Sequence, residues 1–358
     1  MQNFQISTEE NFMPDSIKMK AAWIHAPLDV RIGDTEVPSI DDSKALIKIK
    51  TCGVCPSDVR VYTGARKNAT YPRIAGHEWT GEIVEVGKAV EGFAPGERVV
   101  ADWRVICGEC YYCRRGIFNY CSNMGRGEMK GGFCEYGYAP ARNLRKIPDA
   151  VSFEEASFTE PLACCLNGAN NSNIRIGDDV VVVGTGQIGL MHVQLAKHLG
   201  GRVIACDTIQ SRLEKAKEVG ADDLINVSEG NPVEAVHDLT EGRGANVVIV
   251  AASATKAAET GLEMAGICGT VNFFAGFYPS NPITVDPNLI HYKQLNVTGS
   301  HDFTPHDFTT ALKLIAHGTV NVKTLISHRL PLDEIKQGFD TVIDLAGVKV
   351  MMEVDSDR

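Results

Sequence analysis

The 358-residue chain is long enough for about two domains, and its 44% hydrophobic and 22% charged residues are ordinary for a globular protein. Its formal net charge of −10 leaves no basic excess to offset phosphates, which argues against nucleic acid as a partner. The sequence contains no apolar run long enough to span a bilayer, so we expect no membrane association.

The N-terminal residues 1–20 are polar and acidic and lack the apolar core of a signal peptide. We interpret them as a frayed leader before the first strand. The chain also has eleven cysteines without a sign of export. This combination predicts a cytoplasmic protein, because thiols clustered in a reducing compartment hold metal more often than they form disulfides.

The first third of the chain has the pattern of short strands and turns. Apolar and polar residues alternate over 44–55 and 81–87, as they do in half-buried strands. Proline and glycine are frequent through residues 72–148. These features predict an all-β unit with irregular loops.

A different pattern begins near residue 160. Residues 161–174 predict a helix that ends in an Asn-rich turn, and strands then alternate with helices to about residue 300. We predict strands at 180–183, 202–207, 223–227, 246–252 and 269–276, and helices at 187–200, 211–221 and 257–266. This alternation predicts an α/β fold with a doubly wound parallel sheet. A last helix at 306–318 and strand at 348–354 could return to complete the first domain.

The turn after the first of these buried strands carries the pattern G-x-G-x-x-G at Gly184, Gly186 and Gly189. It follows a strand and opens a helix, which is the context in which the pattern binds a dinucleotide pyrophosphate. Asp207 ends the next strand, where an acid binds the adenosine ribose and repels the extra phosphate of NADP. We therefore expect NAD, although Arg212 nearby keeps NADP as an alternative. A glycine turn that binds nothing is the other interpretation.

Four cysteines lie within fifteen residues at the spacing C-x2-C-x2-C-x7-C: Cys107, Cys110, Cys113 and Cys121. Four thiolates can enclose one tetrahedral zinc ion with no open position, which predicts a structural site. Two disulfides, a redox pair or an iron–sulfur cluster are the alternatives.

A second candidate set is dispersed along the chain and consists of Cys55, His77, Glu78 and Glu160. One thiolate, one imidazole and one or two carboxylates suit a zinc ion that keeps a position for water or substrate. Each of these residues taken singly could equally have a packing role. We assign a packing role to the remaining cysteines, which are Cys52, Cys134, Cys164, Cys165, Cys206 and Cys268.

Together these motifs resemble the zinc-containing medium-chain alcohol dehydrogenase family. The resemblance runs from about residue 18 to the C-terminus and rests on GHEWTGEIVEVG, FAPGERV, the four-cysteine stretch, FTEPLA, and VVVVGTGQIG with Asp207. The Glu of FTEPLA, where liver-type members have Cys, is typical of the polyol branch, which includes sorbitol and L-iditol dehydrogenases. Threonine and cyclitol dehydrogenases are near relatives of that branch.

The resemblance implies a GroES-like catalytic domain at 1–165, with a structural zinc lobe at about 105–125. It implies a Rossmann domain at 166–300 and a segment at 301–358 that returns to the catalytic domain. It also implies a homotetramer, or alternatively a dimer, in which strand 269–276 is the candidate edge at the interface.

For the site, the resemblance implies two zinc ions per chain. Cys55, His77 and Glu78 would hold the catalytic zinc, which Glu160 would bind directly or through its water. Ser57 would start a proton relay to the nicotinamide ribose. The residues that would contact NAD are Gly184, Gly186, Gln187, Ile188, Gly189, Asp207, Arg212, Phe274, Ala275, Gly276, Gly299 and Ser300.

Three departures from relatives bear on the substrate. Arg60 stands where many relatives have the outer His of the relay, and Val61 stands near a Tyr of animal sorbitol dehydrogenases. The segment 299–308, GSHDFTPHDF, lacks the Arg and Tyr that those enzymes use. His301, Asp302 and Glu128 could bind hydroxyl or amino groups, or could be solvated loop residues.

These features predict an NAD-dependent zinc enzyme that reversibly oxidises a secondary alcohol of a polyol to a ketone. An amino-alcohol or cyclitol dehydrogenase with the same mechanism is the first alternative. A catalytically silent cofactor-binding relative is the second, and the joint presence of Cys55, Ser57, His77 and Glu78 argues against it.

Overall fold

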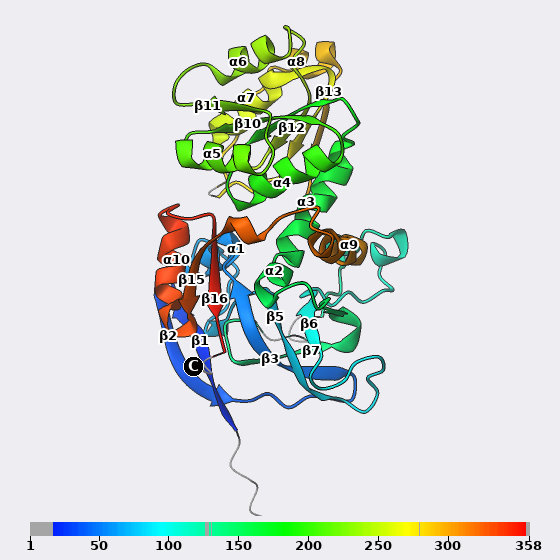
Figure 1. Ribbon diagram of the computed structural model, residues 1–358, viewed down its shortest axis with the longest axis vertical. Helices are drawn as coiled ribbons and strands as arrows, with labels where there is room; N and C mark the ends of the chain where they lie inside the picture. The colour runs from blue at the N-terminus through cyan, green and yellow to red at the C-terminus, as the bar shows by residue number, and fades with distance from the viewer. Residues whose placement is uncertain (1–16, 126–128, 130, 279, 356–358) are drawn as a thin grey trace, which may run out of the picture.

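The computed structural model describes residues 17–125, 129, 131–278 and 280–355, which form two domains, one above the other in Figure 1. Most of the expected leader falls within residues 1–16, and Glu128 falls within 126–128. Both predictions therefore lie outside the described residues.

The upper domain is built on a six-stranded parallel sheet in the order β11-β10-β9-β12-β13-β14. This is the strand order of a Rossmann fold, which confirms the predicted α/β class. Its strands are β9 (Asp179–Val183), β10 (Arg202–Asp207), β11 (Asp223–Asn226), β12 (Ala245–Val250), β13 (Ala265–Phe273) and β14 (Asn296–Gly299). Its helices are α3 (Thr159–Ser172), α4 (Gln187–His198), α5 (Gln210–Glu218), α6 (Pro232–Leu239), α7 (Thr255–Met264) and α8 (Pro287–Lys293).

Strand β9 shows why these strands are continuous apolar runs. Val180 and Val182 pack into the cluster formed with α3, α4 and α5, whereas Val181 and Val183 pack into the cluster formed with α6, α7 and α8. Because helices cover both faces of a parallel sheet, all four valines of the strand are buried.

The edge of this sheet differs from the prediction. Strand 269–276 was expected at the edge, but β13 lies between β12 and β14, and β14 is the edge strand. The prediction failed because β14 has only four residues, with no apolar run, and none of its side chains is buried.

The lower domain is rich in short strands, as predicted. One sheet has the order β15-β16-β3-β5-β6-β8, with β7 also paired to β3, and a smaller sheet has the order β2-β1-β4. The strands are β1 (Lys18–Ala26), β2 (Asp29–Glu36), β3 (Lys44–Gly53), β4 (Arg73–Ile74), β5 (Glu78–Val86), β6 (Arg98–Ala101), β7 (Tyr136–Pro140), β8 (Leu144–Lys146), β15 (Ile326–Pro331) and β16 (Lys349–Glu353). The α-helices are α1 (Pro56–Tyr62), α2 (Phe153–Ser157), α9 (Pro305–Ala316) and α10 (Ile335–Ile343).

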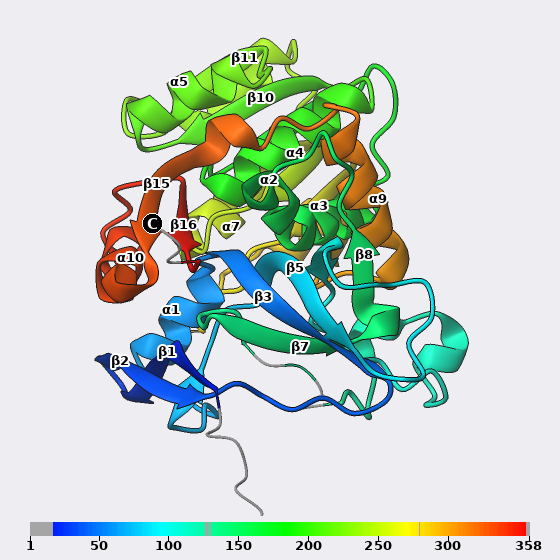
Figure 2. The same cartoon turned by 60° about the horizontal axis from the view of Figure 1, so that its bottom comes forward.

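The end of the chain returns to the first domain, where β16 pairs antiparallel with β3 (Figure 2). Gly53 of β3 has Glu78 of β5 as its register partner on one side and Met351 of β16 on the other. Both ends of the chain therefore contribute to the part of the sheet that precedes Cys55.

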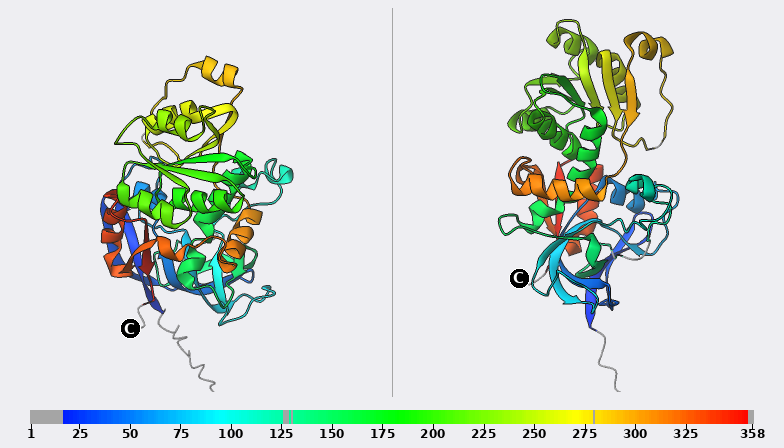
Figure 3. Two further views of the ribbon diagram at one scale, coloured as in Figure 1. Left: turned by 45° about the horizontal axis from the view of Figure 1, so that its top comes forward. Right: turned by 90° about the vertical axis from the view of Figure 1, so that its right-hand side faces the viewer.

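Helix α3 joins the two domains, and α9 packs against it (Figure 3). The boundary expected at residues 165 and 166 falls inside α3, so the chain is helical there. The N-terminal turn of α3 faces the lower domain, and its later residues pack on the parallel sheet. Among the residues that the structure describes, no helix is long and apolar enough to cross a bilayer.

Candidate active site and metal clusters

The four-cysteine stretch forms a compact sulfur cluster in a lobe that contains the 3-10 turns η1 (Cys113–Arg115) and η2 (Phe118–Tyr120). The Sγ atoms of Cys107, Cys110, Cys113 and Cys121 all lie within 4.8 Å of one another, and no disulfide joins them. Cys107 Sγ lies 3.5 Å from Cys121 Sγ and 4.0 Å from Cys113 Sγ. A zinc tetrahedron with Zn–S bonds of about 2.3 Å has S–S edges of about 3.8 Å, so the cluster fits a zinc ion.

Backbone amides in this lobe favour the thiolate form that a metal needs. The amide of Cys113 donates to Cys110 Sγ at 3.5 Å, and the amide of Cys110 donates to Cys107 Sγ at 3.4 Å. Hydrogen bonds from the amides of Cys113 and Ser122 lower the pKa of Cys110 to about 6.

The dispersed candidates also meet in space. One ligand atom from each of Cys55, His77 and Glu78 lies within 4.8 Å of the others. Cys55 occupies the N-cap of α1, where the amide of Ser57 donates to its Sγ at 3.5 Å. Asp58 completes a capping box by accepting from the amide of Cys55 at 3.2 Å, so the start of the helix fixes the position of the sulfur.

Asp58 also orients the histidine, a role that sequence reasoning missed. Its Oδ1 accepts from the amide of Gly76 at 3.1 Å and lies 3.3 Å from His77 Nδ1. A carboxylate on Nδ1 leaves Nε2 for a metal, which is the usual arrangement of a metal-bound histidine. Burial opposes charge on His77, but the negative charges of Asp58, Cys55 and Glu160 raise its pKa well above 6.5.

Glu78 is the first residue of β5 and is paired with Lys349 of β16. The Lys349 Nζ donates to Glu78 Oε2 and lies 3.4 Å from the carbonyl oxygen of Val54. Lys349 thus places a buried positive charge in contact with the Glu78 carboxylate of the cluster. Sequence reasoning missed it because 271 residues separate the partners.

Glu160 lies in the first turn of α3, next to the cluster. Its Oε1 accepts from Trp103 Nε1 at 3.0 Å and lies 3.9 Å from His77 Nε2. Burial raises the pKa of Glu160 to about 7; the positive charge of His77 opposes the rise, and the charges of Glu78 and Asp302 add to it. Glu160 also belongs to a second group, in which its carboxylate, Cys164 Sγ and the Asp302 carboxylate lie within 4.8 Å of one another.

The glycine turn at the start of α4 has the geometry that a pyrophosphate needs. Gly184 has φ of +94°, and a Cβ on Gly189 would lie 1.8 Å from the carbonyl oxygen of Gly184. A Cβ on Gly186, the N-cap of α4, would have no atom within 4 Å. The backbone is therefore tight on the sheet side and open at the helix N-terminus, where a phosphate would be stabilised.

Asp207 is held by the turns around it. Its Oδ2 accepts from the amide and hydroxyl of Thr185 at 2.6 and 3.0 Å, and its Oδ1 accepts from the amide of Ile209 at 3.0 Å. The residue is only 8% exposed. Arg212 follows on α5, and its Nη2 lies 3.4 Å from the carbonyl oxygen of Leu345.

The residues expected near the nicotinamide follow β13 and β14 at the carboxyl edge of the sheet. The amides of Phe274 and Ala275 donate to the carbonyl oxygen of Val250 at 3.1 and 3.0 Å, and exposed Gly276 comes next. Ser300 Oγ accepts from Asn272 Nδ2 at 2.9 Å. Gly299 is the register partner of Phe273. Gln187 and Ile188 are half-buried in the first turn of α4.

The two domains meet at Arg60, whose guanidinium lies 4.3 Å from the ring centroid of Tyr278. Arg60 comes from α1, and Tyr278 lies in the segment after β13. The carboxyl edge of the Rossmann sheet and the Cys55 cluster therefore face the same interdomain region. Ser57, half-buried, lies between Cys55 and Arg60 on α1.

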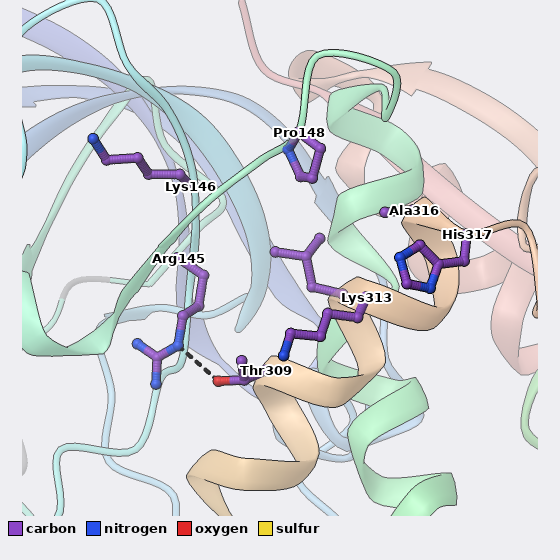
Figure 4. A pocket seen from close by; sticks show the side chains of 8 residues that line it. Arg145, Lys146, Pro148, Thr309, Lys313, Ala316 and His317 are labelled. Atoms are coloured by element: carbon purple, nitrogen blue, oxygen red, sulfur yellow. Dashed lines mark hydrogen bonds between the residues drawn. The ribbon is translucent and has the colours of Figure 1, made fainter.

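A hollow between α9 and the end of β8 contains none of the expected site residues (Figure 4). Arg145, Thr309, Lys313 and His317 line it, and Arg145 Nε donates to Thr309 Oγ1 at 2.9 Å. This hollow is distinct from both metal-ligand clusters.

Comparisons with known proteins agree with this architecture. A family model described as "Alcohol dehydrogenase GroES-like domain" matches residues 41–149, and one described as "Zinc-binding dehydrogenase" matches residues 188–317. A sorbitol dehydrogenase of Halalkalibacterium halodurans is 37% identical over 320 residues, which cover 88% of this chain and 93% of that protein. An L-threonine 3-dehydrogenase of Pseudoalteromonas atlantica is 31% identical over 329 residues, 90% and 94% of the two chains.

A solved structure of a zinc-binding dehydrogenase from Sinorhizobium meliloti, bound to NADP, superposes with a TM-score of 0.89 at 31% identity. The match covers 94% of this chain and all of that chain. Similarity in sequence and in structure thus extends over both domains.

Proposed function

This chain belongs to the zinc-containing medium-chain alcohol dehydrogenases, in their polyol-type branch, and from that membership we propose the reaction it carries out. Its class is that of NAD(P)-dependent zinc oxidoreductases acting on CH–OH donors. Within that class, we propose oxidation of a secondary alcohol of a polyol to a ketone, with reversible hydride transfer to NAD+.

One observation carries the proposal. Cys55, His77 and Glu78 come together beside Glu160, and this cluster faces the carboxyl edge of a Rossmann sheet. This donor set fits a zinc ion because a thiolate, an imidazole and a carboxylate leave one position for substrate. When bound, zinc would supply Lewis acidity that lowers the pKa of an alcohol, and NAD+ would supply the hydride acceptor.

The side chains of the chain have separate tasks in this proposal. Cys55, His77 and Glu78 hold the metal, and Glu160 binds it directly or through water. Asp58 fixes the His77 ring through Nδ1, and Trp103 fixes Glu160 through Oε1. Ser57 Oγ would accept the proton of the substrate hydroxyl while its own proton passes outward toward the nicotinamide ribose. Arg60 cannot pass that proton on as a histidine would, so the proton leaves through water.

We propose a second, structural zinc ion in the cysteine lobe, held by Cys107, Cys110, Cys113 and Cys121. Its support is the set of Sγ separations, which suit a closed tetrahedron. The chain would then carry two zinc ions.

We propose NAD rather than NADP as the cofactor. The carboxylate of Asp207 stands at the end of β10 with its position fixed by Thr185 and Ile209. A fixed negative charge there disfavours the 2′-phosphate of NADP. The Sinorhizobium meliloti relative holds NADP, so cofactor preference needs its own measurement.

A second candidate is an amino-alcohol or cyclitol dehydrogenase with the same mechanism. The L-threonine 3-dehydrogenase relative supports it. For assembly we propose a homotetramer, with a dimer as the alternative, formed through the outer edge of β14, which pairs with no further strand of the described residues. We propose the cytoplasm as its location because all eleven cysteines are free thiols.

The test is an NAD+-reduction screen over sugar alcohols, cyclitols and amino alcohols, with zinc counted on the same sample. We expect about two zinc ions per chain and turnover of a secondary alcohol. Two zinc ions without turnover of any secondary alcohol would contradict the proposed reaction while leaving the metal sites intact.

A further inference from the structure

Asp302 lies beside the proposed active site and is not a solvated loop residue. Its carboxylate is within 4.8 Å of the Glu160 carboxylate, and Glu160 Oε1 is 3.9 Å from His77 Nε2. Only 10% of the Asp302 side chain is exposed. Glu160 thus lies next to both this buried carboxylate and the His77 ring of the metal cluster.

Arg104 holds the backbone and the carboxylate of this loop. Its Nε lies 3.5 Å from Asp302 Oδ1, its Nη1 donates to the carbonyl oxygen of Phe303, and its guanidinium lies 3.5 Å from the Phe303 ring centroid. Arg104 is itself only 1% exposed and also pairs with Asp102, at 3.4 Å. A buried, multiply bonded guanidinium gives Asp302 a fixed position.

Two further elements brace the loop. Asn167 of α3 donates from Nδ2 to the carbonyl oxygen of Asp302 at 2.9 Å. From the cysteine lobe, Asn119 Nδ2 donates to the carbonyl oxygen of His301 at 2.8 Å, and the Tyr120 ring lies 5.7 Å from the His301 ring. Asp302 has φ of +61°, a conformation that costs energy outside glycine and persists here because three elements hold it.

One oxygen of Asp302 is left for a ligand. Within the described part of the chain, the hydrogen bond from the Phe303 amide, at 2.9 Å, and the contact with Arg104 both fall on Oδ1. An ionised carboxylate only accepts hydrogen bonds, so Oδ2 suits a hydroxyl or ammonium donor. With Glu160 adjacent, the same position disfavours a phosphate or carboxylate on the substrate.

We infer that Asp302 determines substrate specificity by accepting a hydrogen bond from a hydroxyl group on the carbon next to the one oxidised. The substrate class is therefore a vicinal diol unit within a polyol. This inference rests on the proposed function, because it requires the reacting hydroxyl to bind at the Cys55–His77–Glu78 cluster.

The test compares 2,3-butanediol with 2-butanol, which differ only in the neighbouring hydroxyl. For Asp302→Asn we expect kcat/KM for the diol to fall about tenfold or more, because a hydrogen bond to a charged acceptor is lost. The value for 2-butanol should change little. Asp302→Gly also removes the carboxylate and suits the positive φ, so it provides a second variant that relieves backbone strain.

Asp102→Asn is the matched control, because Asp102 also pairs with Arg104 but does not belong to the ligand cluster. We expect its diol-to-alcohol ratio of kcat/KM to equal that of the wild type. If the ratio fell equally in Asp302→Asn and Asp102→Asn, the inference would be overturned. Asp302 would then act only by balancing the charge of Arg104. An unchanged ratio in Asp302→Asn and Asp302→Gly would overturn it as well.

The wild-type enzyme separates this inference from the proposed function. If it oxidises 2-butanol but Asp302 variants keep the wild-type ratio, only the inference fails. If the zinc-loaded enzyme oxidises no secondary alcohol, these two and the screened polyols included, with NAD+ or NADP+, the proposed function fails and the inference falls with it. If Asp302→Asn lowered kcat/KM for 3-amino-2-butanol more than for 2,3-butanediol, the group bound by Asp302 would be an ammonium and not a hydroxyl. That result would overturn the inference.

Discussion

Lys349 and Glu78 form an ion pair in which neither side chain is more than 1% exposed. The pair joins β16, near the end of the chain, to the first residue of β5 in the metal cluster. Breaking a buried pair by removing one partner leaves an uncompensated charge in a low-dielectric site. Lys349 therefore supports the cluster as well as the sheet.

Lys349→Met is expected to destabilise the zinc-free protein by about 3–5 kcal/mol, because Glu78 would be left as a buried, unpaired carboxylate. The double variant Glu78→Gln/Lys349→Met should recover part of that loss. The measurement is urea unfolding after zinc has been removed with a chelator. Lys336→Met, which removes an exposed pair with Asp340, is the control and should leave stability close to that of the wild type. Wild-type stability of Lys349→Met would show that the pair contributes nothing.

Cys55→Ser is expected to abolish turnover while NADH binding is retained, because the thiolate is a proposed metal ligand and lies outside the glycine turn. Steady-state kinetics measure turnover, zinc analysis measures metal binding, and NADH fluorescence measures cofactor binding. Cys268→Ser, at an exposed thiol outside both clusters, is the control. Near-normal activity of Cys55→Ser would remove the proposed catalytic site.

Asp207→Asn is expected to shift cofactor preference toward NADP. The substitution removes the negative charge but keeps one acceptor oxygen for the surrounding amides. We expect the NADP-to-NAD ratio of kcat/KM to rise about tenfold, since the repulsion between two charges near a surface is worth about 1–4 kcal/mol. Arg212→Ala serves as the opposite test and should lower that ratio. If the Asp207→Asn ratio stays at the wild-type value, another group sets the preference.

Cys110→Ser is expected to lower stability more than it changes the chemical step. A structural zinc site contributes directly to folding, and the lobe touches the 301–303 loop through Asn119 and Tyr120. We expect a lower Tm, one zinc ion fewer per chain, and a raised KM with kcat retained. Tyr111→Ala, at an exposed side chain of the same lobe, is the control. A stable, fully active Cys110→Ser variant would contradict a structural zinc.

His192 predicts a pH dependence of stability. The side chain is fully buried against Phe274, and neither ring nitrogen has a partner among the described residues. Burial lowers the pKa of His192 from 6.5 to about 3. Because the folded pKa lies below the unfolded one, this contribution to stability is complete above pH 6.5. It is lost as pH falls toward 3, by up to about 1.4 kcal/mol per pH unit.

His192→Leu is therefore expected to flatten the fall in unfolding free energy between pH 6.5 and pH 5. Urea unfolding across that range measures the slope. His306→Leu, at an exposed position, should leave the slope unchanged. If His192→Leu and the wild type lose stability in parallel, His192 does not titrate as its burial requires.

The sequence predicted those features that are encoded locally. The glycine turn and the four cysteines each lie within about fifteen residues. Spacing alone therefore predicted a pyrophosphate-binding turn and a cluster of four thiols. The alternation of apolar strands with helices predicted strands β9 to β13 and helices α4, α5 and α7, but it missed α6, α8 and β14. The last strand was predicted to return to the first domain, and the pairing of β16 with β3 confirms this.

Contacts between distant segments were not predictable from the sequence. Lys349 reaches Glu78 only because β3 places Gly53 between β5 and β16. Trp103 meets Glu160 across the interdomain junction. Asp58 had a local signal, three residues after Cys55 at a helix start, but its bond to His77 depends on tertiary packing. Strand β14 was missed because its pairing with β13, not its composition, makes it a strand.

The return of β16 to β3 has a consequence for synthesis on the ribosome. Glu78 emerges 271 residues before Lys349, so the first domain cannot complete its sheet until Lys349 has left the ribosome. The Rossmann domain, whose strands lie consecutively between 179 and 299, has all of its sheet available earlier. The middle of the chain can thus become a finished unit before its two flanks do. The cluster around Cys55 acquires the buried positive charge of Lys349 only after the whole Rossmann domain has been translated.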